Sequence, residues 1–133
     1  MTAVPFAWPI RVYFEDTDVG GVVYHASYLR FLERARTEWL RAQGIAQARL
    51  MEERGLLFAI TAVEMKFLRP ARLDDELAAS CALDARRGAS LCFSQHLIRP
   101  ADGALLVTAK VRAACLDAQS FRPRAIPDDL ITP

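Results

Sequence analysis

The feature that most constrains the fold is one long segment of helical periodicity followed by several segments of strand-like alternation. Over residues 27–43 apolar side chains recur every three or four positions, with charged side chains on the opposite side. The apolar positions are Tyr28, Phe31, Leu32, Ala35, Trp39 and Ala42. Ser27 is expected to cap this helix and Gly44 to end it. A weaker helix is predicted over residues 46–54.

Runs rich in β-branched and alternating apolar residues predict the strands. These runs span residues 10–14, 57–69, 76–86, 90–99 and 104–116. Turn-forming residues that include glycine separate the last three runs, as is typical of hairpins. One strand, one long helix and four antiparallel strands predict an α+β domain whose helix packs on one face of a sheet of about five strands. The length of 133 residues predicts a single domain over residues 1–133.

Composition and charge exclude several classes of partner. The strands carry more apolar residues than one helix can bury, which predicts that a second subunit covers the remainder. The net charge of +1 offers no general attraction to nucleic acid or to acidic membranes. The sequence shows neither a signal peptide nor a transmembrane segment, so a cytoplasmic location is expected.

The cysteines and histidines do not form a metal-binding pattern. Cys81, Cys92 and Cys115 stand apart without a CxxC pair, so neither a zinc site nor a disulfide framework is expected. The favoured interpretation is three small buried thiols in a reducing compartment. His96 lies in a predicted strand and is interpreted as structural. No other candidate ligand groups with it and His25, so no metal is expected.

The densest polar chemistry lies between the first strand and the long helix. Residues 15–28 read EDTDVGGVVYHASY. A helix N-terminus presents unpaired N–H groups and a positive dipole end, which can polarise a carbonyl. Gly20 and Gly21 allow the backbone to approach a ligand closely, and the carboxylate of Asp18 precedes them. This combination suits acyl transfer. On local spacing alone, a turn closed by the aspartate side chain is the favoured alternative.

A longer segment carries a family resemblance. The stretch RVYFEDTDVGGVVYHASYLRFLERARTEWLRAQGI resembles the opening of the hotdog-fold acyl-CoA thioesterases. Three later segments, MKFLRPARLDDEL, RRGASLCFSQ and FRPRAIP, resemble the same proteins in order and spacing. The resemblance is to the 4-hydroxybenzoyl-CoA thioesterase family, and within it to the YbgC-type branch associated with the Tol–Pal envelope system. It implies a hotdog fold, in which an antiparallel sheet wraps a long helix, and a homo-oligomer that is a dimer or a tetramer. It also implies hydrolysis of acyl-CoA without a separate cofactor, because coenzyme A is part of the substrate.

The resemblance also implies roles for individual residues. The catalytic carboxylate falls on Asp18, as nucleophile or general base, and Asp16 is interpreted as supporting the loop. The N–H that polarises the carbonyl falls at His25, where the helix is expected to begin. Three roles stay open for the His25 side chain: a proton carrier near the leaving sulfur, a donor that orients the substrate, or a bystander. Tyr13, Gly21 and Tyr24 are assigned to substrate binding, with Tyr13 in the preceding strand.

Hydrolysis of a thioester needs few catalytic groups. The thiol leaving group has a pKa of roughly 8.5 by the cysteine reference, so it departs without a strong acid. The sequence has no G-x-S-x-G elbow that would supply a serine nucleophile. For the phosphates of coenzyme A, Arg86 and Arg87 are the candidate surface cations, followed by Arg122 and Arg124. Ordinary solvated arginines are an equally good interpretation of each.

Two alternatives to a thioesterase stay open. A hotdog dehydratase acting on acyl thioesters would pair a histidine with a carboxylate on a different motif, and the EDTD-GG-H pattern argues against it. A non-catalytic partner protein of the envelope machinery could keep the same fold. The presence of Asp18 disfavours that second alternative.

Overall fold

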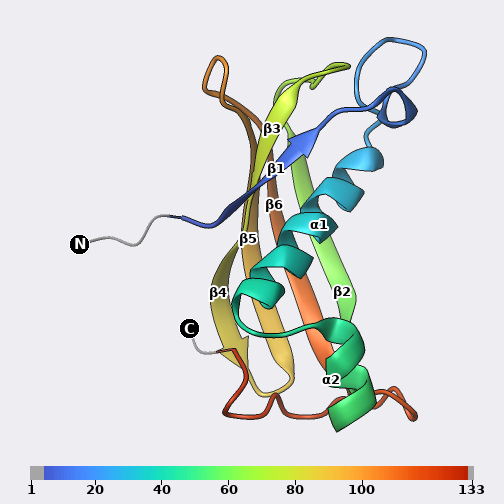
Figure 1. Ribbon diagram of the computed structural model, residues 1–133, viewed down its shortest axis with the longest axis vertical. Helices are drawn as coiled ribbons and strands as arrows, with labels where there is room; N and C mark the ends of the chain where they lie inside the picture. Colours follow the sequence, from blue (N-terminus) through green and yellow to red (C-terminus); the bar gives the residue numbers. More distant parts are fainter. Residues whose placement is uncertain (1–4, 132–133) are drawn as a thin grey trace.

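Two α-helices and six strands make up residues 5–131, the part of the chain that the computed structural model describes (Figure 1). Their bounds are β1 (Ala7–Arg11), a short 3-10 helix η1 (Phe14–Asp16), α1 (Ser27–Ala42), α2 (Gln47–Arg54), β2 (Leu56–Phe67), β3 (Glu76–Ser80), β4 (Ala82–Arg87), β5 (Ser90–Arg99) and β6 (Ala104–Asp117). The α+β class predicted from the sequence is confirmed.

All six described strands form one antiparallel sheet in the order β1-β3-β5-β6-β2, and β4 also pairs with β5. The sheet has one strand more than expected because the predicted run 76–86 is interrupted at Cys81. The backbone N–H of Cys81 donates to Phe6 O (3.3 Å). The chain on either side of Cys81 therefore forms β3 and β4, which follow one another along the same side of β5.

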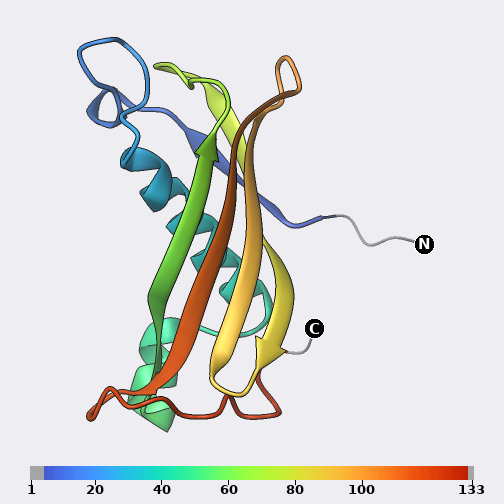
Figure 2. The ribbon, with the colours of Figure 1, turned by 180° about the vertical axis from the view of Figure 1, so that it is seen from behind.

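Helix α1 crosses one face of the sheet (Figure 1), and the opposite face carries no helix of the described chain (Figure 2). The predicted apolar stripe faces the sheet, and the rings of Trp39 and Phe93 pack edge to face at 5.5 Å. Ala42, expected on this stripe, is exposed, and Leu40 is buried instead. Burial of this stripe is the main contribution that α1 makes to the hydrophobic core.

The ends of the elements differ in part from the sequence-based bounds. The first strand ends at Arg11, not at residue 14, because the chain turns into η1 after Tyr13. Ser27 is the first residue of α1 and not its N-cap, which is Ala26. The predicted stop of α1 is confirmed, since Gly44 adopts a φ of +85° that terminates a helix readily only with glycine.

Two further observations concern the described helices and the cysteines, of which Cys92, expected to be buried like the other two, is only half-buried. None of these helices is both long and apolar enough to cross a bilayer. Cys81 and Cys115 are buried and Cys92 is half-buried, and all three thiols are free. Burial raises the pKa of Cys81 to about 12, an effect that the charge of Arg36 only partly offsets. The Cys81 thiol is therefore unreactive near neutral pH.

Candidate active site

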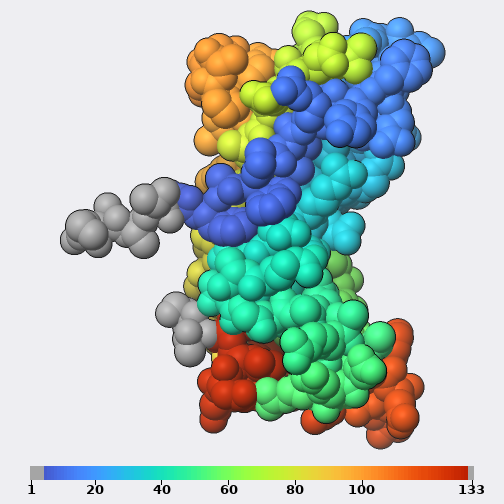
Figure 3. Space-filling model, viewed as in Figure 1, coloured from blue at the N-terminus to red at the C-terminus, as the bar shows by residue number. Residues whose placement is uncertain are grey.

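The loop between β1 and α1 forms a projecting corner at one end of the molecule (Figure 3). Within it, Thr17 and Val23 pair as an isolated antiparallel bridge. The N–H of Asp18 donates to Val22 O (2.9 Å), and the N–H of Gly21 donates back to Asp18 O (3.0 Å). Gly21 closes this turn with a φ of +75°, which side chains other than glycine adopt at a cost.

The side chain of Asp18 closes the tip of the same turn. Its Oδ1 accepts the backbone N–H of Gly20 at 2.8 Å, and the residue is exposed. Within residues 5–131 its Oδ2 accepts no hydrogen bond. The turn predicted as the alternative interpretation is therefore present. It leaves one carboxylate oxygen available to a ligand while it restrains the other, so the turn and a catalytic role are compatible.

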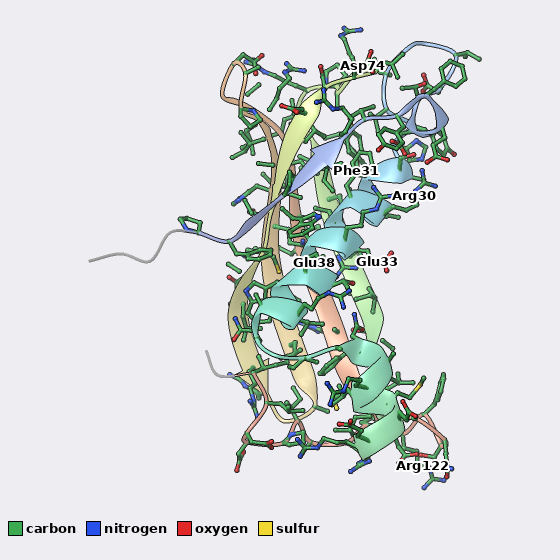
Figure 4. The ribbon with its side chains drawn as sticks, viewed as in Figure 1. Arg30, Phe31, Glu33, Glu38, Asp74 and Arg122 are labelled. Carbon is green, nitrogen blue, oxygen red and sulfur yellow. The ribbon has the colours of Figure 1, made fainter. Side chains whose placement is uncertain are left out.

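Asp16 anchors the loop to α1. This carboxylate is only 2% exposed and accepts the N–H of Tyr13 (2.8 Å) and Nη2 of Arg30 (3.1 Å). Its backbone oxygen accepts the N–H of Tyr24 (2.8 Å). Arg30, which projects from the first turns of α1 (Figure 4), also donates to Ser27 Oγ (3.2 Å). These contacts match the supporting role interpreted for Asp16 and fix the loop relative to the helix.

His25 lies two residues before the first residue of α1, so the helix does not begin at His25 as expected. Ser27 and Leu29 donate their N–H groups to Tyr24 O (2.8 Å) and Ala26 O (3.2 Å). The N–H of His25 makes no such bond to any residue in the described part of the chain. His25 is an exposed residue, and an unpaired N–H beside a helix N-terminus is suited to polarise a carbonyl.

Aromatic rings lie around the side chain of His25. The His25 ring lies 4.5 Å from the ring of Tyr24 and 6.4 Å, edge to face, from that of Phe67 at the end of β2. Tyr13 is 60% exposed and lies after β1, not within the strand as expected. Tyr28 is buried and accepts the N–H of Ala71 (3.1 Å). Burial raises the pKa of Tyr28, so its phenol stays neutral.

Arg86 is not the surface cation that was expected. Its side chain is 14% exposed, and its Nη2 donates to Ile126 O (2.9 Å) and Pro127 O (2.7 Å). Its Nη1 donates to the carbonyl oxygens of Leu130 and Ile131. A guanidinium with this many carbonyl acceptors serves to hold the C-terminal segment against the sheet.

The other three candidate arginines lie far from the loop within one chain. Arg87 is exposed at the β4 end, beside Ser90. Arg124 contacts Gly55 O and Asp117, and Arg122 lies at the end of the molecule opposite the loop (Figure 4). The ten residues of β5 span about 30 Å between these ends. One chain alone therefore does not bring these arginines beside Asp18.

A groove of about 490 Å³ runs between α1 and β2. It begins one turn beyond His25, at Leu29 and Arg30, and continues along the helix to Leu40. Its other wall includes Phe58, Ile60 and Val63 of β2. Neither this groove nor the role of Arg30 could be predicted from the sequence, because both arise from contacts between segments far apart in the chain. The lining of the groove is mostly apolar, so the groove could hold an acyl group.

Comparison with known proteins shows similarity over nearly the whole chain to proteins named as thioesterases. YbgC of Escherichia coli O6:H1, an acyl-CoA thioester hydrolase, is 45% identical over 131 residues, which are 98% of this chain and 96% of that protein. The acyl-CoA thioesterase YbgC of Haemophilus influenzae is 42% identical over 125 residues, 94% of this chain and 90% of that protein. The crystal structure of a probable thioesterase from Bartonella henselae matches with a TM-score of 0.79 at 37% identity, covering 91% of this chain and 96% of that one.

The same relationship appears at the level of the family. The family model of the Thioesterase-like superfamily matches residues 12–132, from the end of β1 through the C-terminal segment. The loop that contains Asp18 and His25, helix α1 and five of the six described strands lie within this range. The resemblance drawn from the sequence motifs is confirmed, and this chain belongs to the Thioesterase-like superfamily, whose members have the hotdog fold.

Proposed function

We propose that this protein hydrolyses acyl-CoA thioesters to a free acid and coenzyme A. The observation that carries the proposal is the pairing, on one restrained loop, of an available Asp18 carboxylate oxygen with an unpaired N–H at His25. The N–H would polarise the thioester carbonyl, and Asp18 would attack it or deprotonate a water. Both E. coli and H. influenzae relatives are named for this reaction, which supports the choice of substrate class.

The path of the reaction needs few further groups. Attack on the carbonyl carbon places negative charge on the carbonyl oxygen, and the N–H of His25 stabilises that charge. Collapse of the intermediate breaks the C–S bond and releases coenzyme A as a thiolate, which its pKa permits near neutral pH. Where water attacks, the free acid forms directly; where Asp18 attacks, water then cleaves the mixed anhydride to give the free acid and the Asp18 carboxylate. The acyl chain would lie in the groove between α1 and β2, where apolar side chains hold it without taking part in the chemistry.

The proposal includes a homodimer formed through β2. This strand pairs only with β6 among the described strands, so its other edge is free. Ile60 and Val63, which also line the groove, expose 46% and 40% of their surfaces along β2, and Phe67 and Leu68 are also exposed at its end. A free edge presents unpaired backbone N–H and C=O groups, and pairing β2 with its copy in a second subunit would close the edge and cover the apolar side chains beside it.

Sedimentation tests the dimer. The wild type should sediment as a dimer or a larger assembly at micromolar concentration, and Ile60→Asp should shift it toward the monomer because a charge would be buried at the joined edge. Leu105→Asp places the same charge on an equally apolar residue, 38% exposed near the start of β6, and should leave the assembly intact. A wild type that sediments as a stable monomer would contradict the dimer.

The release of thiol from a panel of acyl-CoAs of graded length tests the function. A thioesterase releases one thiol for each thioester consumed. A dehydratase converts a hydroxyacyl thioester to an unsaturated one without releasing thiol, and a non-catalytic partner protein does neither. Absence of thiol release across the whole panel would contradict the proposed function.

A further inference from the structure

One face of α1 places two charged side chains along the groove, whose sheet side is apolar and whose other polar lining residues are Arg30, Thr37 and Gln47. Leu29, Glu33, Arg36 and Leu40 recur at helical spacing along the groove, so they form one stripe beside the buried face of the helix. Opposite them lie Phe58 and other apolar residues of the sheet. A purely alkyl ligand needs no charged group in such a stripe, so Glu33 and Arg36 indicate that the ligand is polar at their level.

Arg36 is held in place but only partly satisfied. Its Nη1 donates to Oε1 of Gln95 at 3.0 Å. A guanidinium carries five N–H donors, and no other hydrogen bond or ion pair of Arg36 is made within residues 5–131. Burial lowers the pKa of Arg36 from its ordinary value, and the charges of Cys81 and Glu33 partly offset this effect. The group nevertheless stays protonated, as arginine does in proteins.

Gln95 fixes the direction of that contact. This side chain is completely buried, and its Nε2 donates to Leu32 O (3.0 Å) and Ser80 O (3.1 Å). With both amide hydrogens taken, its oxygen must face Arg36 and cannot exchange places with the nitrogen. Arg36 is therefore oriented at the base of the groove with donors to spare.

Glu33 supplies the complementary group. It is exposed and projects from α1 on the side of β2 (Figure 4), one turn before Arg36. The carboxylate of Glu33 only accepts hydrogen bonds, whereas the guanidinium of Arg36 only donates them. No ion pair joins the two side chains, so both are available to a ligand. A hydroxyl group, which both donates and accepts, satisfies both at once, and a carboxylate would be repelled by Glu33.

We propose that Arg36 and Glu33 select an acyl chain that carries a hydroxyl group on its distal part. This inference rests on the proposed thioester hydrolysis and names the substrate within that class. From Ser27 to Arg36 the helix rises about 14 Å. An extended alkyl chain with C–C bonds of about 1.5 Å advances about 1.25 Å per carbon. Allowing for the C–O bond, the hydroxyl is therefore expected on about the tenth or eleventh carbon of the chain, counting the thioester carbonyl as the first.

Three substrates of equal length test the selection: decanoyl-CoA, 10-hydroxydecanoyl-CoA and the mono-CoA thioester of decanedioic acid. For the wild type, kcat/KM should be about tenfold higher for the hydroxylated chain than for the plain chain, because a hydrogen bond to a charged group is gained. Arg36→Met should bring this ratio close to one. Arg34→Met, which removes an arginine stacked on Phe31 at 5.8 Å outside the groove, should leave the ratio unchanged.

A second variant does not depend on the buried Gln95 contact. Glu33→Gln removes an exposed charge, keeps an acceptor for the hydroxyl, and should raise kcat/KM for the dicarboxylic substrate several-fold by removing repulsion. Thermal unfolding of Arg36→Met shows whether its fold survives. If Arg36→Met does not fold, the kcat/KM of Glu33→Gln for the dicarboxylic substrate decides whether the selection holds.

The outcomes separate this inference from the function on which it rests. Equal kcat/KM for plain and hydroxylated chains in the wild type would overturn the selection and leave the hydrolysis proposal standing. A preference for the dicarboxylic chain in the wild type would also overturn it, in favour of an anion site at Arg36. If none of the three is hydrolysed while a shorter acyl-CoA is, the selection is overturned and the hydrolysis proposal stands. If no acyl-CoA of the graded panel is hydrolysed either, the proposed function fails. Calorimetric binding of free 10-hydroxydecanoic acid against decanoic acid then decides the selection alone, and equal affinities would overturn it.

Discussion

Replacing Asp18 by asparagine is expected to lower kcat for acyl-CoA hydrolysis by about a hundredfold to ten-thousandfold, the range that a positioned base contributes. The fold should survive, because Asn can still accept the N–H of Gly20 through its side-chain oxygen and so keep the turn. The affinity for acyl-CoA should change little, since the acyl group and the nucleotide do not depend on this charge. Rates under saturating substrate, with the Kd measured separately, check both expectations.

Asp74 provides the matched control for that substitution. It is an exposed aspartate at the same end of the molecule (Figure 4), and its φ of +71° is one that asparagine tolerates. Asp74→Asn therefore removes one negative charge near the loop without touching the carboxylate of Asp18. It should leave kcat near the wild-type value. Loss of turnover in Asp74→Asn but not in Asp18→Asn would move the catalytic role away from Asp18.

Replacing Arg86 by methionine is expected to have the largest effect on stability among the residues considered for coenzyme A. The change removes the donor shared by four carbonyl groups of the C-terminal segment, including Ile126 O and Pro127 O. We expect a loss of about 2–3 kcal/mol in the free energy of unfolding, as for hydrogen bonds to a charged group. For a chain of this length that is a fall in Tm of about 10 °C.

Hydrogen exchange shows which segment loses stability in Arg86→Met. Amides of residues 126–131 should lose protection in Arg86→Met, because Ile126 and Ile131 are buried only while the segment is held. Arg87→Met removes the neighbouring exposed arginine and should change neither Tm nor this protection. Unchanged protection in Arg86→Met would contradict the role of Arg86 as a clamp.

Much of the fold was predictable because the periodicity of apolar residues and the turn-forming residues are local features of the sequence. Helix α1 and its buried stripe follow from spacing alone, and Gly44 marks its end. The break at Cys81 was not predictable, because alternation continues through it and only the contact with Phe6 O divides the run. The early end of β1 likewise depends on the carboxylate of Asp16, which draws the N–H of Tyr13 into a turn.

In the candidate site, too, the residues that are contiguous in sequence could be predicted, and those brought together only by the fold could not. The loop with Asp18 and His25 is contiguous in sequence, so its motif could be recognised there. Arg30 was missed because its partner Asp16 lies fourteen residues away, and nothing in the spacing distinguishes this arginine from the other arginines of α1. Arg86 was wrongly expected at the surface, because an arginine beside a hairpin turn usually faces solvent. In this fold the C-terminal segment returns over Arg86 and buries its side chain.

The most direct test of the central claim is the origin of the oxygen in the product. Acyl-CoA is incubated with the protein in ¹⁸O-labelled water, and the acid, the thiol and the label are measured by mass spectrometry. We expect equal amounts of acid and thiol, with the oxygen gained by the acid coming from water over many turnovers, and almost no product from Asp18→Asn. Thiol release that yields no labelled acid, or that continues unchanged in Asp18→Asn, would contradict hydrolysis at this loop.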